Sequence, residues 1–194
     1  ERFRRQRQMC IRDRLNEPKN RHAEKYSSRL FQSFPREDPH PWLFNNRDYL
    51  GNLTSIRRFA AELSAVDDGV GKVMALREAG ISENTLVVFT ADQGWVGGHG
   101  GFWGMGDHTR PLTAYDGMLQ IPLIANRPGA IPPGSEYDQL VSNYDVMPTL
   151  LSTLGLKDKM PNKPVSPGRD FSPALRGEFE SWKDEVFYEF ENTR

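Results

Sequence analysis

The sequence has little of what marks the most easily recognised protein classes. Cys10 is its only cysteine, which excludes an internal disulfide framework and leaves the compartment open. No apolar run approaches the roughly 20 residues that span a membrane, and no apolar segment of a secretory signal is visible. The net charge is −1, so the chain as a whole lacks the basic excess typical of nucleic-acid binders. These absences predict a globular protein with no membrane span and no nucleic-acid partner.

The charge that is present is unevenly spread along the chain. Residues 1–14 carry six arginines against Glu1 and Asp13. A basic run of this kind is usually a solvated tail and less often an anion-binding arm. It shows no clear apolar periodicity, and its MCIRDR string resembles translated sequencing-adapter sequence. We therefore interpret residues 1–14 as a non-native or disordered leader and leave them out of the fold.

An apolar strand that ends in oxygen-bearing side chains is the most informative feature of the chain. The β-branched, aliphatic and aromatic run 86–89 favours a central strand covered on both faces. Asp92 and Gln93 follow at its carboxyl end, where open α/β sheets place their ligands. Two adjacent oxygen donors with Gly94 behind them suit a hard cation such as Ca²⁺ or Mg²⁺. The same residues also fit a plain turn, and by themselves they leave both interpretations open.

A long helix precedes this strand. Apolar spacings of three and four predict that it begins at a cap, Thr54 or Ser55, and ends at Gly80. Two glycines inside the helix, Gly69 and Gly71, predict close packing against a neighbour, because glycine otherwise weakens a helix.

Two aspartates in the same helix, Asp67 and Asp68, are candidate metal ligands by residue type alone. Adjacent helical residues diverge by about 100°, which favours a solvated face or a local salt bridge instead.

The rest of the chain alternates between short elements and loops. The expected elements are a short helix around 24–31, an edge strand at 120–125, a helix at 141–154 with Pro148 in its first turn, a short helix at 172–176 and a strand at 186–190.

A glycine-rich loop over residues 94–117 follows the first strand. Its glycines forbid a packed element and allow a close approach of backbone to a ligand. Three aromatic residues in it, Trp95, Phe102 and Trp103, argue against disorder because they require burial. Loops of this length are usually functional or disordered, so the aromatic residues favour a functional loop.

The order of these segments resembles the sulfatase family of the alkaline-phosphatase superfamily. The helix SAVDDGVGKVMALREAG precedes ENTLVVFTADQG, then GGHGGFWGMG, IPLI, RPG, SNYDVMPTLLSTLG and GRDFSPALRG. The resemblance covers about residues 38–194 and corresponds to the C-terminal part of the family's catalytic domain. It implies an α/β fold, a partial alkaline-phosphatase-like three-layer sandwich with a mostly parallel sheet flanked by helices. It also implies a leader at 1–14, a partial catalytic domain at 15–176 and the start of a C-terminal sheet subdomain at 177–194.

The resemblance implies roles for particular residues. Asp92 and Gln93 stand where the family places two ligands of its divalent cation, usually Ca²⁺, with Mg²⁺ as the alternative. The family more often has Asn or His at the second position, and Gln offers the same carboxamide oxygen on a longer arm. His99 matches a histidine near the sulfate. Met105 stands where the family has a sulfate-binding lysine.

Basic residues near Met105 are candidates to replace that lysine. Arg110 suits a tetrahedral oxyanion, although a solvated loop position explains it equally well. His108 is a catalytic candidate or a structural hydrogen-bonder. His40, held stiffly between two prolines, is a weaker substrate-binding candidate, and a surface-loop position is the more common reason for such a histidine.

The family's nucleophile, a formylglycine made from the Cys or Ser of a C-x-P-x-R motif, is not expected in this chain. Arg12 occupies the proline position after Cys10. We therefore expect a fragment of a sulfate-ester hydrolase that is unstable and inactive alone, with a sulfated small molecule or glycan as its partner. Two alternatives remain: a phosphodiesterase or phosphonate hydrolase of the same superfamily, and a degenerate, non-catalytic binder of sulfated glycans.

Overall fold

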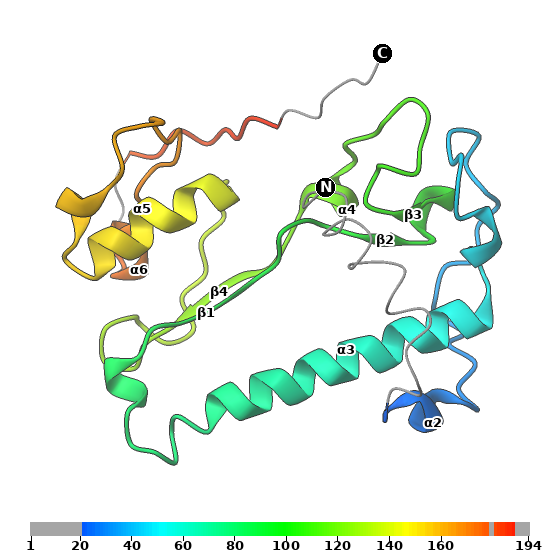
Figure 1. Cartoon of the computed structure of the whole chain (residues 1–194), viewed down its shortest axis with the longest axis horizontal. Coiled ribbons are helices and arrows are strands. Elements are labelled where there is room, and N and C mark those ends of the chain that lie inside the picture. Colours follow the sequence, from blue (N-terminus) through cyan, green and yellow to red (C-terminus); the bar gives the residue numbers. More distant parts are fainter. Residues whose placement is uncertain (1–20, 179–180, 189–194) are drawn as a thin grey trace. The chain divides into compact units, whose positions relative to one another are not determined.

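A computed structural model of the chain describes residues 21–178 and 181–188. The proposed leader, Cys10 included, lies outside the described residues. Tertiary contacts divide the described chain into two units (Figure 1). The first contains residues 21–75 and 95–113, and the second contains residues 76–94, 114–178 and 181–188. None of the described helices is long and apolar enough to cross a membrane.

The long helix of the first unit is α3, Leu53–Met74. Asn52 caps it, since its Oδ1 accepts from Thr54 N at 3.0 Å and Ser55 N at 3.2 Å. The predicted caps, Thr54 and Ser55, are therefore wrong by two and three residues. Their backbone N–H groups belong to the first turn of the helix and donate to the true cap, Asn52. The helix also ends six residues before Gly80, which instead takes a left-handed conformation in the turn beyond it.

The two glycines of α3 do not pack closely in the described structure. A Cβ on Gly69 or on Gly71 would meet no atom within 4 Å. Asp68 does form a salt bridge, but not the local one that was predicted, because its carboxylate pairs with Arg21 and His22, which are 47 and 46 residues away in the sequence. The hydrogen bond from Arg21, and to a lesser degree the one from His22, holds the pKa of Asp68 below its ordinary value.

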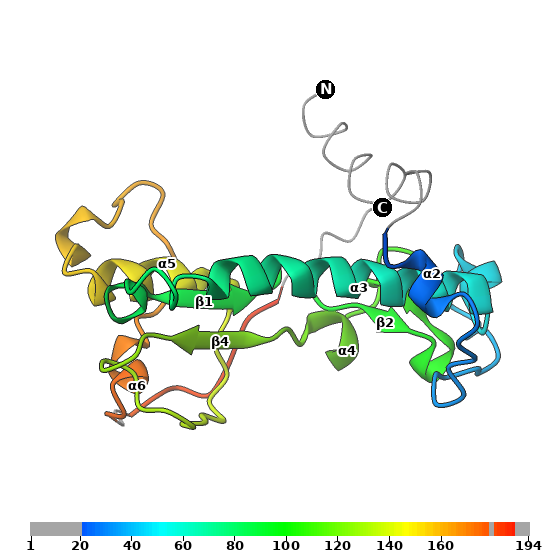
Figure 2. The ribbon, with the colours of Figure 1, turned by 90° about the horizontal axis from the view of Figure 1, so that it is seen from below.

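Helix α2, Ala23–Tyr26, lies against α3 (Figure 2). Tyr26 Oη and Ser64 Oγ are 2.7 Å apart and join the two helices. The predicted helix around 24–31 is thus present but shorter, one turn only.

Aromatic side chains form the centre of the first unit. Two short strands, β2 (Val96–Gly97) and β3 (Trp103–Gly104), pair in antiparallel register. Trp95 stacks on Phe59 of α3 with ring centroids 4.2 Å apart and meets Trp103 edge-on at 4.9 Å. The prediction that the glycine-rich loop is anchored by its aromatic residues is therefore confirmed, since Trp103 is 8% exposed.

The second unit contains the strand that carries Asp92. Strand β1, Val87–Thr90, pairs with β4, Leu123–Asn126, and the two run side by side in both views (Figures 1 and 2). The pairing is antiparallel, and so is every other ladder among the described residues. The expected mostly parallel sheet is not shown there. The expected burial of β1 on both faces is also wrong, because a single partner strand leaves Phe89 39% exposed.

Helix α5, Asn143–Thr153, occupies the place predicted for the second helix. Its cap is Ser142, which forms a capping box with Asp145. Pro148 lies in the helix interior and not in the first turn as predicted. A proline there leaves the carbonyl of Tyr144 without its helical donor, and the backbone of Gly168 approaches this carbonyl so closely that a Cβ would be 1.9 Å from the oxygen.

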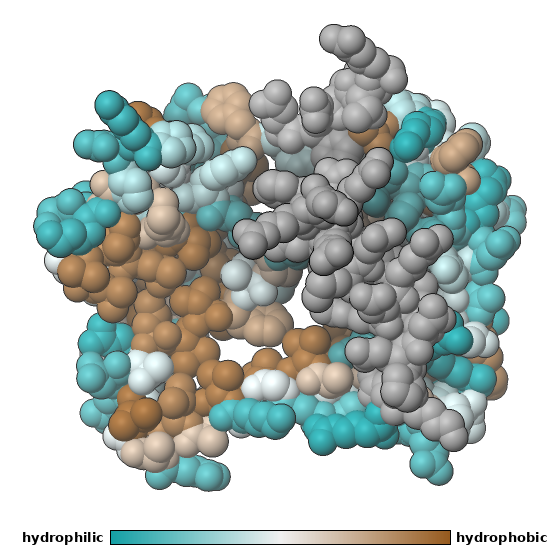
Figure 3. Space-filling view, viewed as in Figure 1, coloured by the Kyte–Doolittle hydropathy of each residue, from teal (hydrophilic) through white to brown (hydrophobic). Residues whose placement is uncertain are grey.

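Two short helices complete the second unit: α4, Asp116–Leu119, and α6, Ser172–Leu175, the latter as predicted. The predicted strand at 186–190 is not seen over 186–188, and its last two residues lie outside the described chain. Figure 3 shows hydrophobic side chains gathered on the face that carries β1, β4 and α5. Such exposed apolar side chains include Phe89, Ile124, Met147 and Leu154.

Candidate functional site

The two predicted metal ligands lie where the sequence places them, directly after β1. The side chains of Asp92 and Gln93 are both exposed. Gly94 is buried behind them, and its N–H donates to the carbonyl of Met118 at 3.1 Å. A Cβ on Gly94 would be 2.6 Å from the Met118 carbonyl carbon. The glycine is therefore required by this close approach and not by a positive φ.

Asn143, at the start of α5, fixes the backbone of the same segment. Its Nδ2 donates to the carbonyls of Ala91 at 3.2 Å and Asp92 at 3.0 Å. Asn143 is not among the site residues predicted from the sequence. The available signal was a carboxamide in the first turn of the predicted helix, but no spacing rule connects it to a strand more than fifty residues earlier. Asn143 thus fixes the backbone segment that bears the candidate ligands Asp92 and Gln93.

The remaining predicted site residues, His40, His99, His108 and Arg110, belong to the first unit. The structure brings His40 together with the glycine-rich loop. The backbone N–H of His40 donates to the carbonyl of Gly101 at 2.9 Å, and the imidazole ring stacks on Phe102 with centroids 4.3 Å apart. A Cβ on Gly101 would lie 2.2 Å from the carbonyl oxygen of Asp38, so only glycine permits this contact.

The tautomer of neutral His40 follows from its own loop. Its Nδ1 lies 3.1 Å from the backbone N of Trp42 and accepts from that N–H. An Nδ1 that accepts has no proton, so the neutral ring carries its proton on Nε2. His40 thus presents an Nε2–H donor while its ring plane is fixed by Phe102.

His108 lies over β3 beside an aspartate. Its Nε2 is 3.5 Å from Oδ1 of Asp107. That oxygen is buried and has no hydrogen-bond partner among the described residues. A Cβ on Gly104 would be 2.7 Å from the imidazole, so the glycine makes room for the ring.

Arg110 and His99 are both exposed. Nη1 of Arg110 donates to the carbonyls of Asp107 at 3.1 Å and Thr109 at 2.7 Å, which orients the guanidinium. His99 begins a short 3₁₀ turn, His99–Gly101, and no bond of its side chain is found among the described residues. Met105, where the resemblance expects a lysine, is half-buried.

Three or more His, Cys, Asp or Glu side chains do not come together in metal-binding geometry anywhere in residues 21–178 and 181–188. Asp92 and Gln93 by themselves offer two oxygen ligands. Calcium takes six to eight, so these two residues form only part of a coordination shell.

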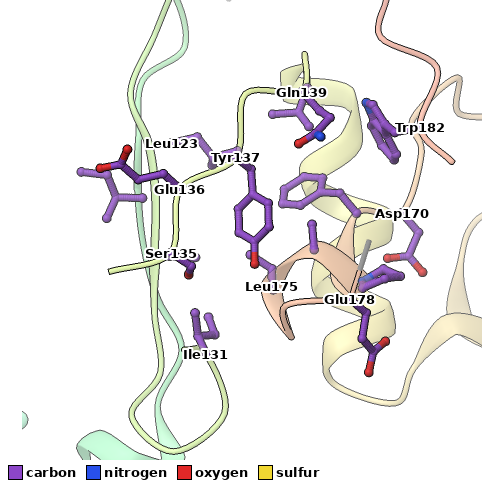
Figure 4. Close-up of a pocket in the computed structure, with 16 residues that line it drawn as sticks. Leu123, Ile131, Ser135, Glu136, Tyr137, Gln139, Asp170, Leu175, Glu178 and Trp182 are labelled. Atoms are coloured by element: carbon purple, nitrogen blue, oxygen red, sulfur yellow. The ribbon is translucent and has the colours of Figure 1, made fainter. Parts of the chain in front are cut away.

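A cavity of about 410 Å³ lies elsewhere in the second unit, between β4, the 131–139 segment and α6 (Figure 4). Its walls are mostly apolar, with Tyr137, Trp182 and three carboxylates, and it contains none of the predicted site residues. Hydrogen bonding from Arg176 lowers the pKa of Glu178, which keeps that carboxylate charged. Negative groups at the rim repel a sulfate, so the cavity does not suit the predicted chemistry.

Comparison with known proteins identifies the class. The family model described as Sulfatase matches residues 16–156, and the chain belongs to the sulfatase family. Membership implies an alkaline-phosphatase-like α/β fold, of which the described residues contain helices and two small sheets. The resemblance seen in the sequence is thereby confirmed.

Several named relatives are similar to the chain. N-acetylgalactosamine-6-sulfatase of Rattus norvegicus is 32% identical over 177 residues, which is 87% of this chain and 32% of that protein. Steryl-sulfatase of the same organism is 31% identical over 172 residues, 84% of this chain and 29% of that protein. Arylsulfatase A of Homo sapiens is 35% identical over 137 residues, 67% of this chain and 25% of that protein. The chain spans about a third of the length of the first two relatives.

Proposed function

We propose that this chain is the part of a sulfate-ester hydrolase that supplies two metal ligands and several sulfate-binding side chains. The observation that carries the proposal is the pair Asp92–Gln93, exposed directly after β1 in a member of the sulfatase family. Adjacent carboxylate and carboxamide oxygens suit a hard cation, with Ca²⁺ preferred and Mg²⁺ as the alternative.

The cation, once bound, would supply Lewis-acid stabilisation of charge on the sulfuryl group. Asp92 and Gln93 would hold it, together with oxygen ligands beyond the pair. Asn143 would keep their backbone segment fixed through its bonds to Ala91 and Asp92. A backbone segment that is already held in place loses less conformational entropy when its side chains bind a cation. The bonds from Asn143 therefore favour tighter binding.

The side chains of the first unit would act on the substrate. The guanidinium of Arg110 and the Nε2–H of His40 are donors for sulfate oxygens. His108, or else His99, would protonate the leaving alcohol as the sulfur–oxygen bond to it breaks. The attacking oxygen would come from the family's formylglycine, for which Cys10 is no candidate, and the chain by itself is then inactive.

The metal assignment is tested by titrating the longest protein that carries this chain with Ca²⁺ in a calorimeter. Asp92→Ala should abolish the binding heat and Gln93→Ala should weaken it. Asp138→Ala is the matched control, an exposed aspartate of the same unit without a hydrogen bond among the described residues. Calcium binding that survives Asp92→Ala would refute the assignment.

The reaction class is tested with 4-methylumbelliferyl sulfate and bis(4-methylumbelliferyl) phosphate, a phosphodiester of the same alcohol, in the longest protein that carries this chain. Preferred cleavage of the sulfate supports a sulfatase, and preferred cleavage of the phosphate supports a phosphodiesterase or phosphonate hydrolase. Met105 favours a second candidate function, because a thioether offers neither charge nor a donor to sulfate. A protein that binds sulfated sugars without cleaving either ester would be that degenerate binder.

A further inference from the structure

Two exposed aromatic side chains of the first unit, Trp42 and Phe44, have no role in the proposed function, although they lie beside His108 and Arg110. Leu43 and Thr109 form an isolated antiparallel bridge. The flanking bonds run from Arg110 N to Trp42 O at 2.8 Å and from Phe44 N to His108 O at 2.8 Å. Trp42 therefore stands opposite Arg110, and Phe44 stands opposite His108.

Alternation along the bridge separates its side chains onto two sides. Leu43 and Thr109 are 0% and 1% exposed and point into the unit. Their neighbours on both strands point the other way, because successive side chains of an extended segment alternate. The guanidinium carbon of Arg110 lies 5.8 Å from the ring centroid of Phe44, which places the two on the same side. We call the four side chains Trp42, Phe44, His108 and Arg110 the outer bridge face.

Two large rings of this face are open to solvent. Trp42 is 42% exposed and Phe44 is 66% exposed. Trp42 is nevertheless held, since the His40 ring packs against it edge-on with centroids 5.3 Å apart. Fixed aromatic rings on a surface are the usual means of contacting a ligand with little loss of side-chain entropy.

The charge beside the rings fits one anionic group. Arg110 is oriented by the carbonyls that its Nη1 meets, and its Nη2 has no hydrogen-bond partner among the described residues. Arg47 is a second arginine nearby, and its Nη1 donates to the carbonyl of Leu43 at 2.8 Å. One or two guanidinium groups suit a single sulfate better than the repeated phosphates of a nucleic acid, which need several cations.

We propose that the outer bridge face binds the sugar ring of a sulfated saccharide, with Phe44 and Trp42 against the ring and Arg110 on the sulfate. The proposal rests on the proposed function and names its substrate class. A pyranose has an apolar face of C–H groups and a rim of hydroxyls. An open aromatic surface accepts that face and leaves the hydroxyls in water, whereas a purely aromatic ester gains most from an enclosed apolar pocket.

The test is saturation-transfer NMR on the 194-residue chain with galactose 6-sulfate, galactose and phenyl sulfate as probes. Inorganic sulfate carries no proton to observe, so its binding is measured by calorimetric titration. Wild type should saturate the ring protons of galactose 6-sulfate. Phe44→Ala should weaken that binding about three- to tenfold, the usual range for one aromatic contact, and leave inorganic sulfate unchanged. Arg110→Gln should weaken both sulfated probes and inorganic sulfate.

Two further variants keep the result interpretable. Phe44→Trp preserves an aromatic surface and should retain sugar binding, which separates a binding role from a folding defect. Phe187→Ala removes an exposed phenylalanine of the second unit, 84% exposed, and should change nothing.

The outcomes distinguish this proposal from the proposed function. If inorganic sulfate binds through Arg110 but the sugar binds no more tightly than sulfate, the saccharide assignment is wrong and the sulfatase proposal stands. If phenyl sulfate alone depends on Phe44, the occupant is an aryl ester and the saccharide assignment is again overturned. If Arg110→Gln changes no sulfated probe and no sulfate, the sulfate role of Arg110 in the proposed function fails as well.

Discussion

Arg169 and Asp145 hold the C-terminal segment of the second unit against helix α5. The carboxylate of Asp145 is 2% exposed and accepts from the backbone N of Arg169 at 2.6 Å and from its Nη2 at 3.4 Å. The guanidinium also donates to the carbonyl of Lys183 at 2.5 Å and lies 4.2 Å from the ring of Trp182. One arginine thus satisfies a buried charge and anchors a segment without regular structure.

Replacing Arg169 by Ala should release residues 181–188 and destabilise the second unit by about 2–3 kcal/mol, because the buried carboxylate of Asp145 loses one donor. Hydrogen exchange measured by mass spectrometry should show faster exchange in peptides from 181–188 and from the start of α5. Arg176→Ala is the control, since its pair with Glu178 is exposed and should cost below about 1 kcal/mol. Equal effects of the two variants would contradict the anchoring role.

Asn143 should affect the affinity for the cation although its side chain is not a ligand. Asn143→Ala removes both bonds to the Ala91–Asp92 backbone and should weaken Ca²⁺ binding about tenfold, as the loss of an outer support usually does. Asn126→Ala, an exposed asparagine at the far end of the β1–β4 ladder, should leave affinity unchanged. Calorimetric titration of the two variants measures this, and an unaltered dissociation constant in Asn143→Ala would remove the positioning role.

Asp170 should make the second unit sensitive to acid. Burial raises its pKa, but hydrogen bonds from Ser152 and Ser172 and the charge of Lys157 outweigh this and lower the pKa below the ordinary value. A lowered folded-state pKa stabilises the fold above the unfolded pKa, near 4, and that stability is lost as pH falls through the folded-state pKa. Asp170→Asn should therefore destabilise by about 1 kcal/mol at pH 7. In urea denaturation the gap to wild type should narrow near pH 3; a gap independent of pH would contradict this.

The glycines of α3 offer a stabilising change. A Cβ at Gly71 meets no atom within 4 Å, and alanine is preferred to glycine inside a helix by about 0.5–1 kcal/mol. Gly71→Ala should raise the free energy of unfolding by that amount. Gly168→Ala is the opposite control, because its Cβ would collide with the carbonyl of Tyr144. A destabilised Gly71→Ala would indicate that α3 has a close neighbour outside the described residues.

Local elements were predictable where local chemistry decides them. The apolar spacing of α3, the position of α5 and the aromatic anchoring of the glycine-rich loop follow from residue type and period. The cap of α3 was missed because Asn52 competes with Thr54 and Ser55, which are equally good capping residues, and only backbone geometry selects among them. Pro148 was placed in the first turn because the sequence does not fix the residue at which α5 begins.

The sequence by itself determined the family, the alternation of helix and strand, and the position of Asp92 and Gln93 behind an apolar strand, because these depend on order and composition along the chain. The tertiary structure decided which distant groups meet: Asn143 on the Asp92 backbone, Arg169 on Asp145, and the aromatic pair Trp42 and Phe44 opposite His108 and Arg110. Such contacts depend on chain reversal and on hydrogen-bond partners many residues apart, which no local periodicity encodes.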